Sequence, residues 1–193
     1  MLFLISPRRV PTGAMKVGYV GLLNMMNLNQ TSIRKEYLFC TFKNGSAGVL
    51  NFKKRKLEFL SEPNHAETIF ETAFKPTDKN ILASASFDGK IKIWNVDGMQ
   101  CISTFGKQAS IDLQIHSADM AQFKKFAIYS ISWHPKENKI ASGDADGDLT
   151  VWDCDKGRLL DKVTPGSHNP IFKVDWNPND PSQIASGSSD AAW

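Results

Sequence analysis

The fold of this chain is decided by residues 65–96, HAETIFETAFKPTDKNILASASFDGKIKIWNV. This stretch holds four short strand-like pieces, and none reaches the ten or more residues of helical periodicity that a helix needs. Its last piece, residues 90–93, alternates lysine with isoleucine, which is the period of a half-buried strand. Asp88-Gly89 before it predicts a tight hairpin turn, because glycine tolerates positive φ. Pro76 marks the preceding turn.

The same pattern recurs twice further along the chain. Residues 128–157 read IYSISWHPKENKIASGDADGDLTVWDCDKG, and residues 171–193 read IFKVDWNPNDPSQIASGSSDAAW. The copies share a turn proline, a turn aspartate and, in two of them, a tryptophan: Pro76, Pro135 and Pro178; Asp88, Asp146 and Asp190; Trp94 and Trp152. The second interval is 43 to 44 residues, and an insert of about 15 residues lengthens the first interval to 58 or 59.

A weaker copy precedes these three. Residues 37–60 read YLFCTFKNGSAGVLNFKKRKLEFL, and Gly48 lies 41 residues before Gly89, with which we align it. The run Val49–Phe52 then replaces the strand that carries the tryptophan, and Lys53 takes the tryptophan position.

A repeat in the low forties, with four strands, a histidine near its start and Trp-Asp or Trp-Asn near its end, resembles the WD40 family. The resemblance covers residues 37–193, and residues 59–96 resemble one individual member of that family in particular. It implies an all-β fold, with about three to four four-stranded antiparallel blades of a β-propeller in an incomplete ring.

The repeats divide the chain into six segments. We expect an N-terminal lead-in or degenerate blade at 1–36, a degenerate repeat at 37–64, repeats at 65–105 and 128–165 with an insert loop at 106–127 between them, and a truncated repeat at 166–193. Propellers use four to eight blades, and each blade buries its apolar face only against its neighbours. We therefore expect a fragment of a longer protein, whose further blades close the ring. Ring completion by another chain is the alternative.

The resemblance also implies a buried, hydrogen-bonded tetrad in each repeat: a histidine before the first strand, a serine or threonine on the second, the turn aspartate and the tryptophan of the third. The implied members are His65, Ser84 (or Ser86), Asp88 and Trp94; then Ser142, Asp146 and Trp152; then His168, Ser186 and Asp190. The middle repeat has no histidine four residues before Ile128, which predicts a less tightly fixed turn there. The last tryptophan would fall at position 196, beyond this sequence.

Serine, histidine and aspartate together also suggest a hydrolase. A catalytic triad needs an exposed nucleophile beside an oxyanion hole, whereas these residues recur with the repeat and no nucleophile elbow accompanies them. His116, Asp112 and Asp119 in the insert lack a close pair of metal ligands, and the aspartates of residues 144–148 fail the calcium-loop spacing. We therefore expect no catalysis, no cofactor and no metal site.

Composition adds broad limits. The chain of 193 residues is 41% hydrophobic and 22% charged, which is ordinary for a globular protein, and its net charge of +3 demands neither a nucleic-acid nor a membrane partner. The run Lys53–Lys56 has no interleaved aromatic residue, so we interpret it as a solvated turn rather than a nucleic-acid contact. Three scattered cysteines and the absence of an 18-residue apolar run predict a soluble protein of a reducing compartment, which we take to be cytoplasmic.

For function, the resemblance implies a non-catalytic scaffold that binds other proteins on its rim and central face. Phe87 precedes the turn Asp88, and the matching positions hold Ala145 and Ser189, so the turn itself does not require an aromatic residue. Phe87 is therefore a candidate partner-binding residue, with packing against a neighbouring blade as the alternative. Two other functions stay open. One is a substrate receptor of a cullin-type ubiquitin ligase, although the blade ends WNVD and WDCD lack the arginine of Trp-Asp-x-Arg; the other is a nucleic-acid-associated propeller subunit.

Overall fold

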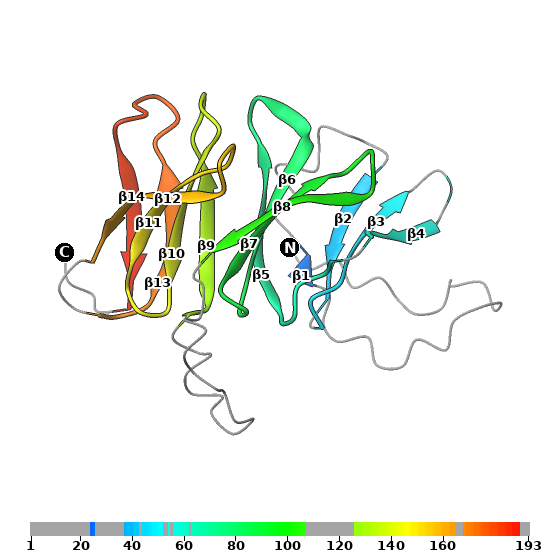
Figure 1. The fold of residues 1–193 in the computed structure, drawn as a ribbon, viewed down its shortest axis with the longest axis horizontal. Coiled ribbons are helices and arrows are strands. Elements are labelled where there is room, and N and C mark those ends of the chain that lie inside the picture. Colours follow the sequence, from blue (N-terminus) through cyan, green and yellow to red (C-terminus); the bar gives the residue numbers. More distant parts are fainter. Residues whose placement is uncertain are drawn as a thin grey trace, which may run out of the picture.

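Four antiparallel sheets lie side by side in the computed structural model of this chain, which describes residues 24–25, 37–42, 44–51, 54, 56–61, 63–106, 126–164 and 168–189 (Figure 1). We call the sheets blades 1 to 4. Blade 1 holds β1 (Asn24–Met25), β2 (Tyr37–Thr41), β3 (Ala47–Asn51) and β4 (Lys56–Phe59). Blade 2 holds β5 (Ile69–Lys75), β6 (Asp78–Ser86), β7 (Lys90–Asn95) and β8 (Gln100–Gly106). Blade 3 holds β9 (Ile128–Trp133), β10 (Lys139–Asp144), β11 (Leu149–Asp153) and β12 (Arg158–Val163), and blade 4 holds β13 (Ile171–Trp176) and β14 (Ile184–Ser188).

Each blade is a meander, because its strands pair in sequence order. The turns between the second and third strands contain a glycine of positive φ in three blades: Gly45 at 80°, Gly89 at 76° and Gly147 at 81°. The alignment of Gly48 with Gly89 was therefore wrong, since Gly48 lies inside β3, opposite Cys40. Asn44-Gly45 makes the turn instead, and the Asn44 side chain accepts a hydrogen bond from the Ser46 N–H at 3.2 Å.

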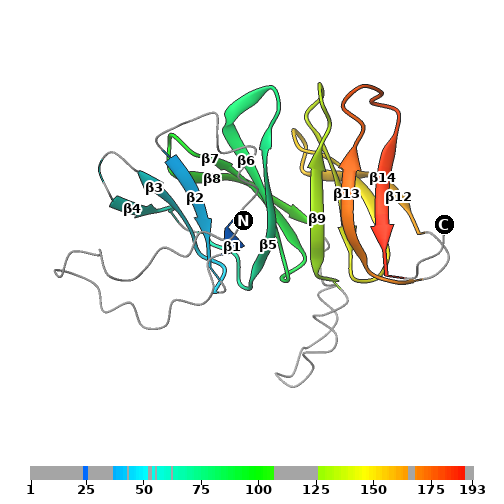
Figure 2. The same ribbon diagram turned by 180° about the vertical axis from the view of Figure 1, so that it is seen from behind.

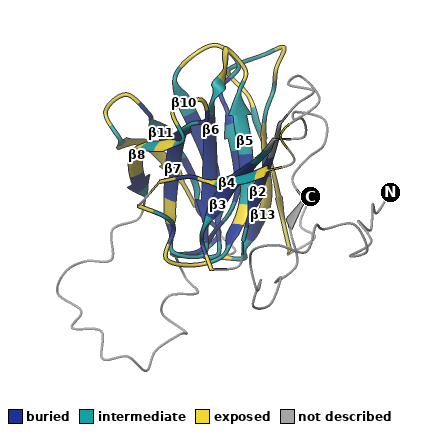
Figure 3. Ribbon diagram, turned by 90° about the vertical axis from the view of Figure 1, so that its right-hand side faces the viewer, coloured by how far each residue is buried: buried dark blue, intermediate teal, exposed yellow. Residues whose placement is uncertain are grey.

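The core lies between blades. One cluster joins blades 1 and 2 around the fully buried Trp94, and a second joins blades 2 and 3 around Ile91, Ile140 and Trp152. Figure 3 shows buried residues concentrated on β6 and β7, the middle strands of blade 2. The free energy of burial therefore comes mostly from stacking one blade on the next.

The innermost strands β5, β9 and β13 follow one another across the molecule (Figure 2). Each has one edge without a strand partner in the described sheets, and at the edges of β9 and β13 side chains of the preceding blade accept hydrogen bonds. The bonds run from the Ile131 N–H to Glu71 at 2.8 Å, from the Val174 N–H to Ser130 at 3.0 Å and from the Trp176 N–H to Ser132 at 2.9 Å. Glu71 also forms an ion pair with Lys173, two blades away.

The turn between β9 and β10 depends on a histidine. The Nδ1 atom of His134 accepts hydrogen bonds from the Lys136 N–H at 3.1 Å and the Glu137 N–H at 2.8 Å, and the ring packs edge-on against Trp176 with centroids 4.6 Å apart. In the corresponding turn of blade 4, Asn177 accepts the same pair of amide bonds. Burial lowers the pKa of His134 below its usual value; Glu137 opposes this shift, and the nearby lysines add to it.

Gly143 of β10 lies close against β13 of blade 4. A Cβ added there would collide with the Ile171 side chain and lie 3.0 Å from Val174 Cγ1, whereas a Cβ at the equivalent Gly187 of β14 would meet nothing. We expect Gly143→Ala to lower the free energy of unfolding by about 1–3 kcal/mol, because over-packing forces the strands apart. Gly187→Ala is the matched control and should change it by less than about 0.5 kcal/mol. Equal effects in urea unfolding would contradict the tight approach.

A pH series should reveal the role of His134. Because its Nδ1 accepts two amide bonds, protonation breaks them, so the unfolded chain binds this proton more readily than the folded one. The contribution of neutral His134 to the free energy of unfolding should be complete above about pH 6.5, the ordinary histidine pKa. It should decrease as the pH falls below that value toward the lowered pKa of the folded protein. His134→Asn keeps an acceptor, as Asn177 does, but does not titrate. Its melting temperature should fall less than that of the unsubstituted protein between pH 7 and 5, and parallel curves would refute the argument.

Candidate functional site

Blade 2 brings together the first predicted tetrad around the hydroxyl of Ser84. His65 Nε2 lies 2.7 Å from Ser84 Oγ, and the Trp94 indole N–H donates to the same oxygen at 2.8 Å. The other ring nitrogen, His65 Nδ1, is 2.9 Å from an Asp88 carboxylate oxygen. Ser86 bonds elsewhere, to the Glu67 carbonyl and the Asp88 N–H, so the hydroxyl in this network is that of Ser84.

Asp88 ties the network to the backbone. Its carboxylate accepts the Ala66 N–H at 3.0 Å and the Lys90 N–H at 2.9 Å, which joins the loop before β5 to the turn before β7. Burial raises the pKa of Asp88, but the hydrogen bond and charge of His65, together with these amides, outweigh burial and hold the pKa below its ordinary value. The carboxylate therefore stays ionised at neutral pH.

The geometry of blade 2 does not suit a catalytic nucleophile. Ser84 is 0% exposed, and its oxygen is bonded on both sides, so no substrate can reach it. Burial also raises the pKa of the Cys40 thiol to about 11 and that of Cys154 to about 12, which keeps both thiols protonated. Within the described part of the chain, no cluster of three metal-ligating side chains occurs, and no helix there is long and apolar enough to cross a bilayer.

Blade 3 builds its network differently. The Trp152 indole N–H donates to Ser142 Oγ at 2.8 Å and to Thr150 Oγ1 at 3.1 Å, and the two hydroxyls are 2.6 Å apart. Thr150 thus bonds the serine that a histidine bonds in blade 2, a role that the sequence analysis missed. The signal was present, since Thr150 stands two residues before its tryptophan, where blade 2 has Lys92. Among the described residues, no hydrogen bond joins Asp146 to this network.

Blade 4 does not assemble the same group. His168 and Ser186 are both exposed, and no hydrogen bond joins these two described side chains. Asp190 lies outside the described residues, as do His116, Asp112 and Asp119 of the insert. The structure therefore brings together the predicted tetrad residues of blade 2, part of those of blade 3 and none of those described in blade 4.

Phe87 belongs to a row of four aromatic side chains, which we call the aromatic row. Its ring centroid lies 6.1 Å from that of Phe70, which lies 5.1 Å from Tyr129, which lies 5.3 Å from Phe172. The last three are the second residues of β5, β9 and β13, where the register of each blade shifts. Such a bulge leaves one residue unpaired and re-aims its side chain. Phe70 is 38% exposed and Phe172 is 54% exposed.

Adjacent four-stranded meanders with a buried Ser–Trp bond define a class of protein, the β-propellers built from WD repeats. Comparison with family models agrees with this class. Residues 58–95 match the WD domain, G-beta repeat, and residues 113–179 match the anaphase-promoting complex subunit 4 WD40 domain. The chain belongs to the WD40 repeat family.

Several curated proteins are similar to this chain. GATOR2 complex protein WDR24 of Homo sapiens is 27% identical over 128 residues, which is 65% of this chain and 14% of that protein. WD repeat-containing protein VIP3 of Arabidopsis thaliana is 27% identical over 114 residues, 59% of this chain and 34% of that protein. E3 ubiquitin-protein ligase COP1 of the same plant is 29% identical over 140 residues, 70% of this chain and 19% of that protein. These matches support the family, but not specifically the resemblance of residues 59–96 to WD repeat-containing protein 17.

Serine-to-alanine variants at one repeat position should separate the two networks. Ser84→Ala leaves two buried nitrogens, on His65 and Trp94, without their partner, at about 1–3 kcal/mol each. Ser142→Ala should cost about 1 kcal/mol, because the Trp152 N–H keeps Thr150. Ser186→Ala, at the exposed equivalent in blade 4, is the control and should have no measurable effect. Measured by urea unfolding, the loss in the free energy of unfolding should be largest for Ser84→Ala, smaller for Ser142→Ala and absent for Ser186→Ala. Equal losses for the Ser84 and Ser142 variants would contradict the difference between the two networks.

Proposed function

We propose that this chain is a non-catalytic scaffold that binds another protein through the aromatic row. The observation that carries the proposal is the position of the rings. The rings come from the innermost strands of three consecutive blades and from one turn, and each ring contacts the next one in the row. Two of the four, Phe70 and Phe172, are exposed.

The rings are not needed to build the blades. A bulge residue takes no part in the strand pairing, and contacts between partly exposed rings contribute only about 0.5–1.5 kcal/mol per pair. Contiguous exposed apolar surface in a folded domain commonly marks an interaction site, and aromatic side chains dominate binding energy at protein interfaces.

The backbone beneath the row is rigidly held. Glu71, Ser130 and Lys173 directly follow the three bulge residues, and each takes part in a hydrogen bond or ion pair between blades. A partner would therefore dock on rings whose strands are already ordered, which reduces the entropic cost of binding.

The names of similar proteins agree with an interaction role. One relative is named as a member of the GATOR2 complex, and one matching family model is named for a subunit of the anaphase-promoting complex. COP1 is named as a ubiquitin ligase, so a role as a ligase substrate receptor stays a prediction, without support from the blade ends. For nucleic-acid binding, the described part of the Lys53–Lys56 run holds Lys54 and Lys56, and the Lys56 amino group pairs with Glu58 at 3.2 Å.

Site-directed photo-crosslinking tests the proposal. Benzoylphenylalanine placed at Phe70 or Phe172 in the protein expressed in its own cells should form a discrete protein adduct. The same reagent at Phe59, which is 47% exposed on the outer strand β4, is the matched control and should not form that adduct. Phe70→Ala together with Phe87→Ala should weaken capture of the identified partner by about 30-fold or more. An adduct formed equally at position 59, or unchanged capture by a variant that still folds, would overturn the proposal.

A further inference from the structure

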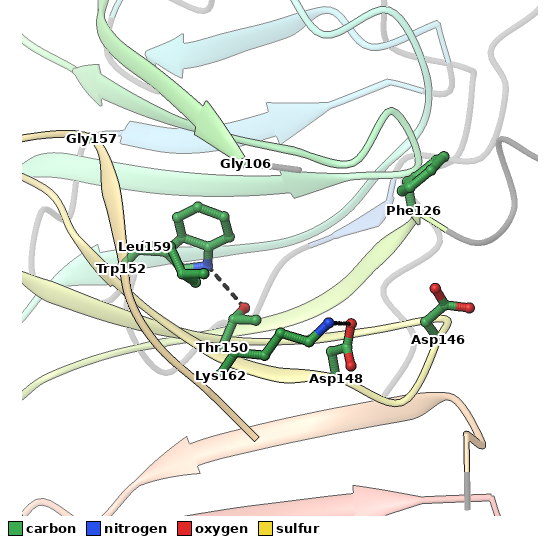
Figure 4. A pocket seen from close by; sticks show the side chains of 9 residues that line it. All are labelled: Gly106, Phe126, Asp146, Asp148, Thr150, Trp152, Gly157, Leu159 and Lys162. Carbon is green, nitrogen blue, oxygen red and sulfur yellow. Dashed lines mark hydrogen bonds and ion pairs between the residues drawn. The ribbon is translucent and has the colours of Figure 1, made fainter. Parts of the chain in front are cut away.

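A cavity of about 540 Å³ lies between blades 2 and 3, on the side of Trp152 (Figure 4). Gly106, at the end of β8, and Phe126 line it from one direction. Blade 3 supplies the remaining lining residues: Asp146, Asp148, Thr150, Trp152, Gly157, Leu159 and Lys162. The cavity shares no residue with the aromatic row.

In blade 2 the equivalent surface of the tryptophan is covered by the chain itself. His65, which is 3% exposed, lies with its ring centroid 6.5 Å from that of Trp94. The buried Lys92 lies two residues before Trp94 and donates from Nζ to Thr104 Oγ1 at 3.0 Å. Blade 2 therefore gives an example of the side chains that fit beside the tryptophan of this repeat.

Blade 3 lacks both of these side chains in the part that the structure describes. Thr150 replaces Lys92, and its hydroxyl turns to Ser142, 2.6 Å away. Lys162 replaces Thr104 and pairs with Asp148 at 2.7 Å. A shorter side chain therefore stands beside Trp152, and no described residue supplies an imidazole there.

The polar groups of the cavity match a ring that carries N–H donors. In blade 2 the turn carboxylate, Asp88, bonds the ring nitrogen His65 Nδ1. Asp146 holds the same turn position in blade 3 and lines the cavity. The neighbouring Asp148 already has Lys162 and the Thr164 hydroxyl as partners, each at 2.7 Å. Asp146 is therefore the carboxylate placed to receive an incoming donor.

We propose that this cavity receives a histidine side chain of a partner protein, with one imidazole N–H donating to Asp146 and the ring lying against Trp152. The occupant would complete in blade 3 the arrangement that His65 makes within blade 2. Imidazole itself is the smallest probe of the site, and a five-atom ring should bind with a dissociation constant on the order of millimolar.

The test follows the indole N–H signal of Trp152 by NMR, assigned with Trp152→Phe, while imidazole is titrated into the full chain. A saturable shift is expected. Asp146→Asn should weaken binding about tenfold or more, whereas Asp161→Asn, at an exposed carboxylate of β12, should leave it unchanged. No saturable shift, or equal binding by the Asp146 variant, would overturn the proposal.

A second variant uses the repeat as its own control. Thr150→Lys combined with Lys162→Thr recreates beside Trp152 the Lys92–Thr104 pair, next to which His65 fits in blade 2, so a folded double variant should keep the saturable imidazole shift. Loss of the shift in a folded double variant would count against the site. His116→Ala distinguishes the source of the ring: if imidazole binds only to this variant, the chain's own histidine is the occupant and the proposal of a partner histidine is wrong.

Discussion

The stacking of blades 2, 3 and 4 depends on the backbone amides at the open edges of the innermost strands β9 and β13. A buried N–H without an acceptor is costly, and a strand that ends a sheet has no neighbouring strand to accept its bonds. Here the acceptor is a side chain of the blade before. Glu71 accepts the N–H of Ile131, and Ser130, at the same repeat position, accepts that of Val174. Polar bonds and an apolar cluster therefore both join blade 2 to blade 3, and the aromatic row rests on the strands that they fix.

The serine that accepts the tryptophan N–H is itself bonded by a different side chain in each of two blades. Blade 2 uses a histidine from the preceding loop, and blade 3 uses Thr150 from the same strand as Trp152. In both blades a serine hydroxyl, Ser84 or Ser142, accepts the buried indole N–H, which is the strict physical requirement. The two blades differ in what lies beside the tryptophan: the buried His65 and Lys92 in blade 2, and Thr150 with the cavity in blade 3.

Features set by local chemistry could be predicted from the sequence. Asp-Gly predicted the turns at Gly89 and Gly147, and the repeat spacing predicted the blades and the family. Features that depend on partners distant in the chain could not. Both Asn44-Gly45 and the segment at Gly48 could form the turn between β2 and β3, and only the pairing of the two strands shows that Gly48 lies inside β3. The bulges that expose Phe70 and Phe172 arise from register shifts, which an alternating pattern does not reveal.

The ion pair between Glu71 and Lys173 has a geometric meaning of its own. These two residues belong to blades 2 and 4, yet they meet past the intervening blade 3 because both lie on innermost strands, Glu71 on β5 and Lys173 on β13. Two blades that are not neighbours can be bridged only where the strands converge on a common axis. The ion pair therefore constrains the angle between successive blades. A smaller angle would move Lys173 and Glu71 apart, and a larger angle would bring them too close together.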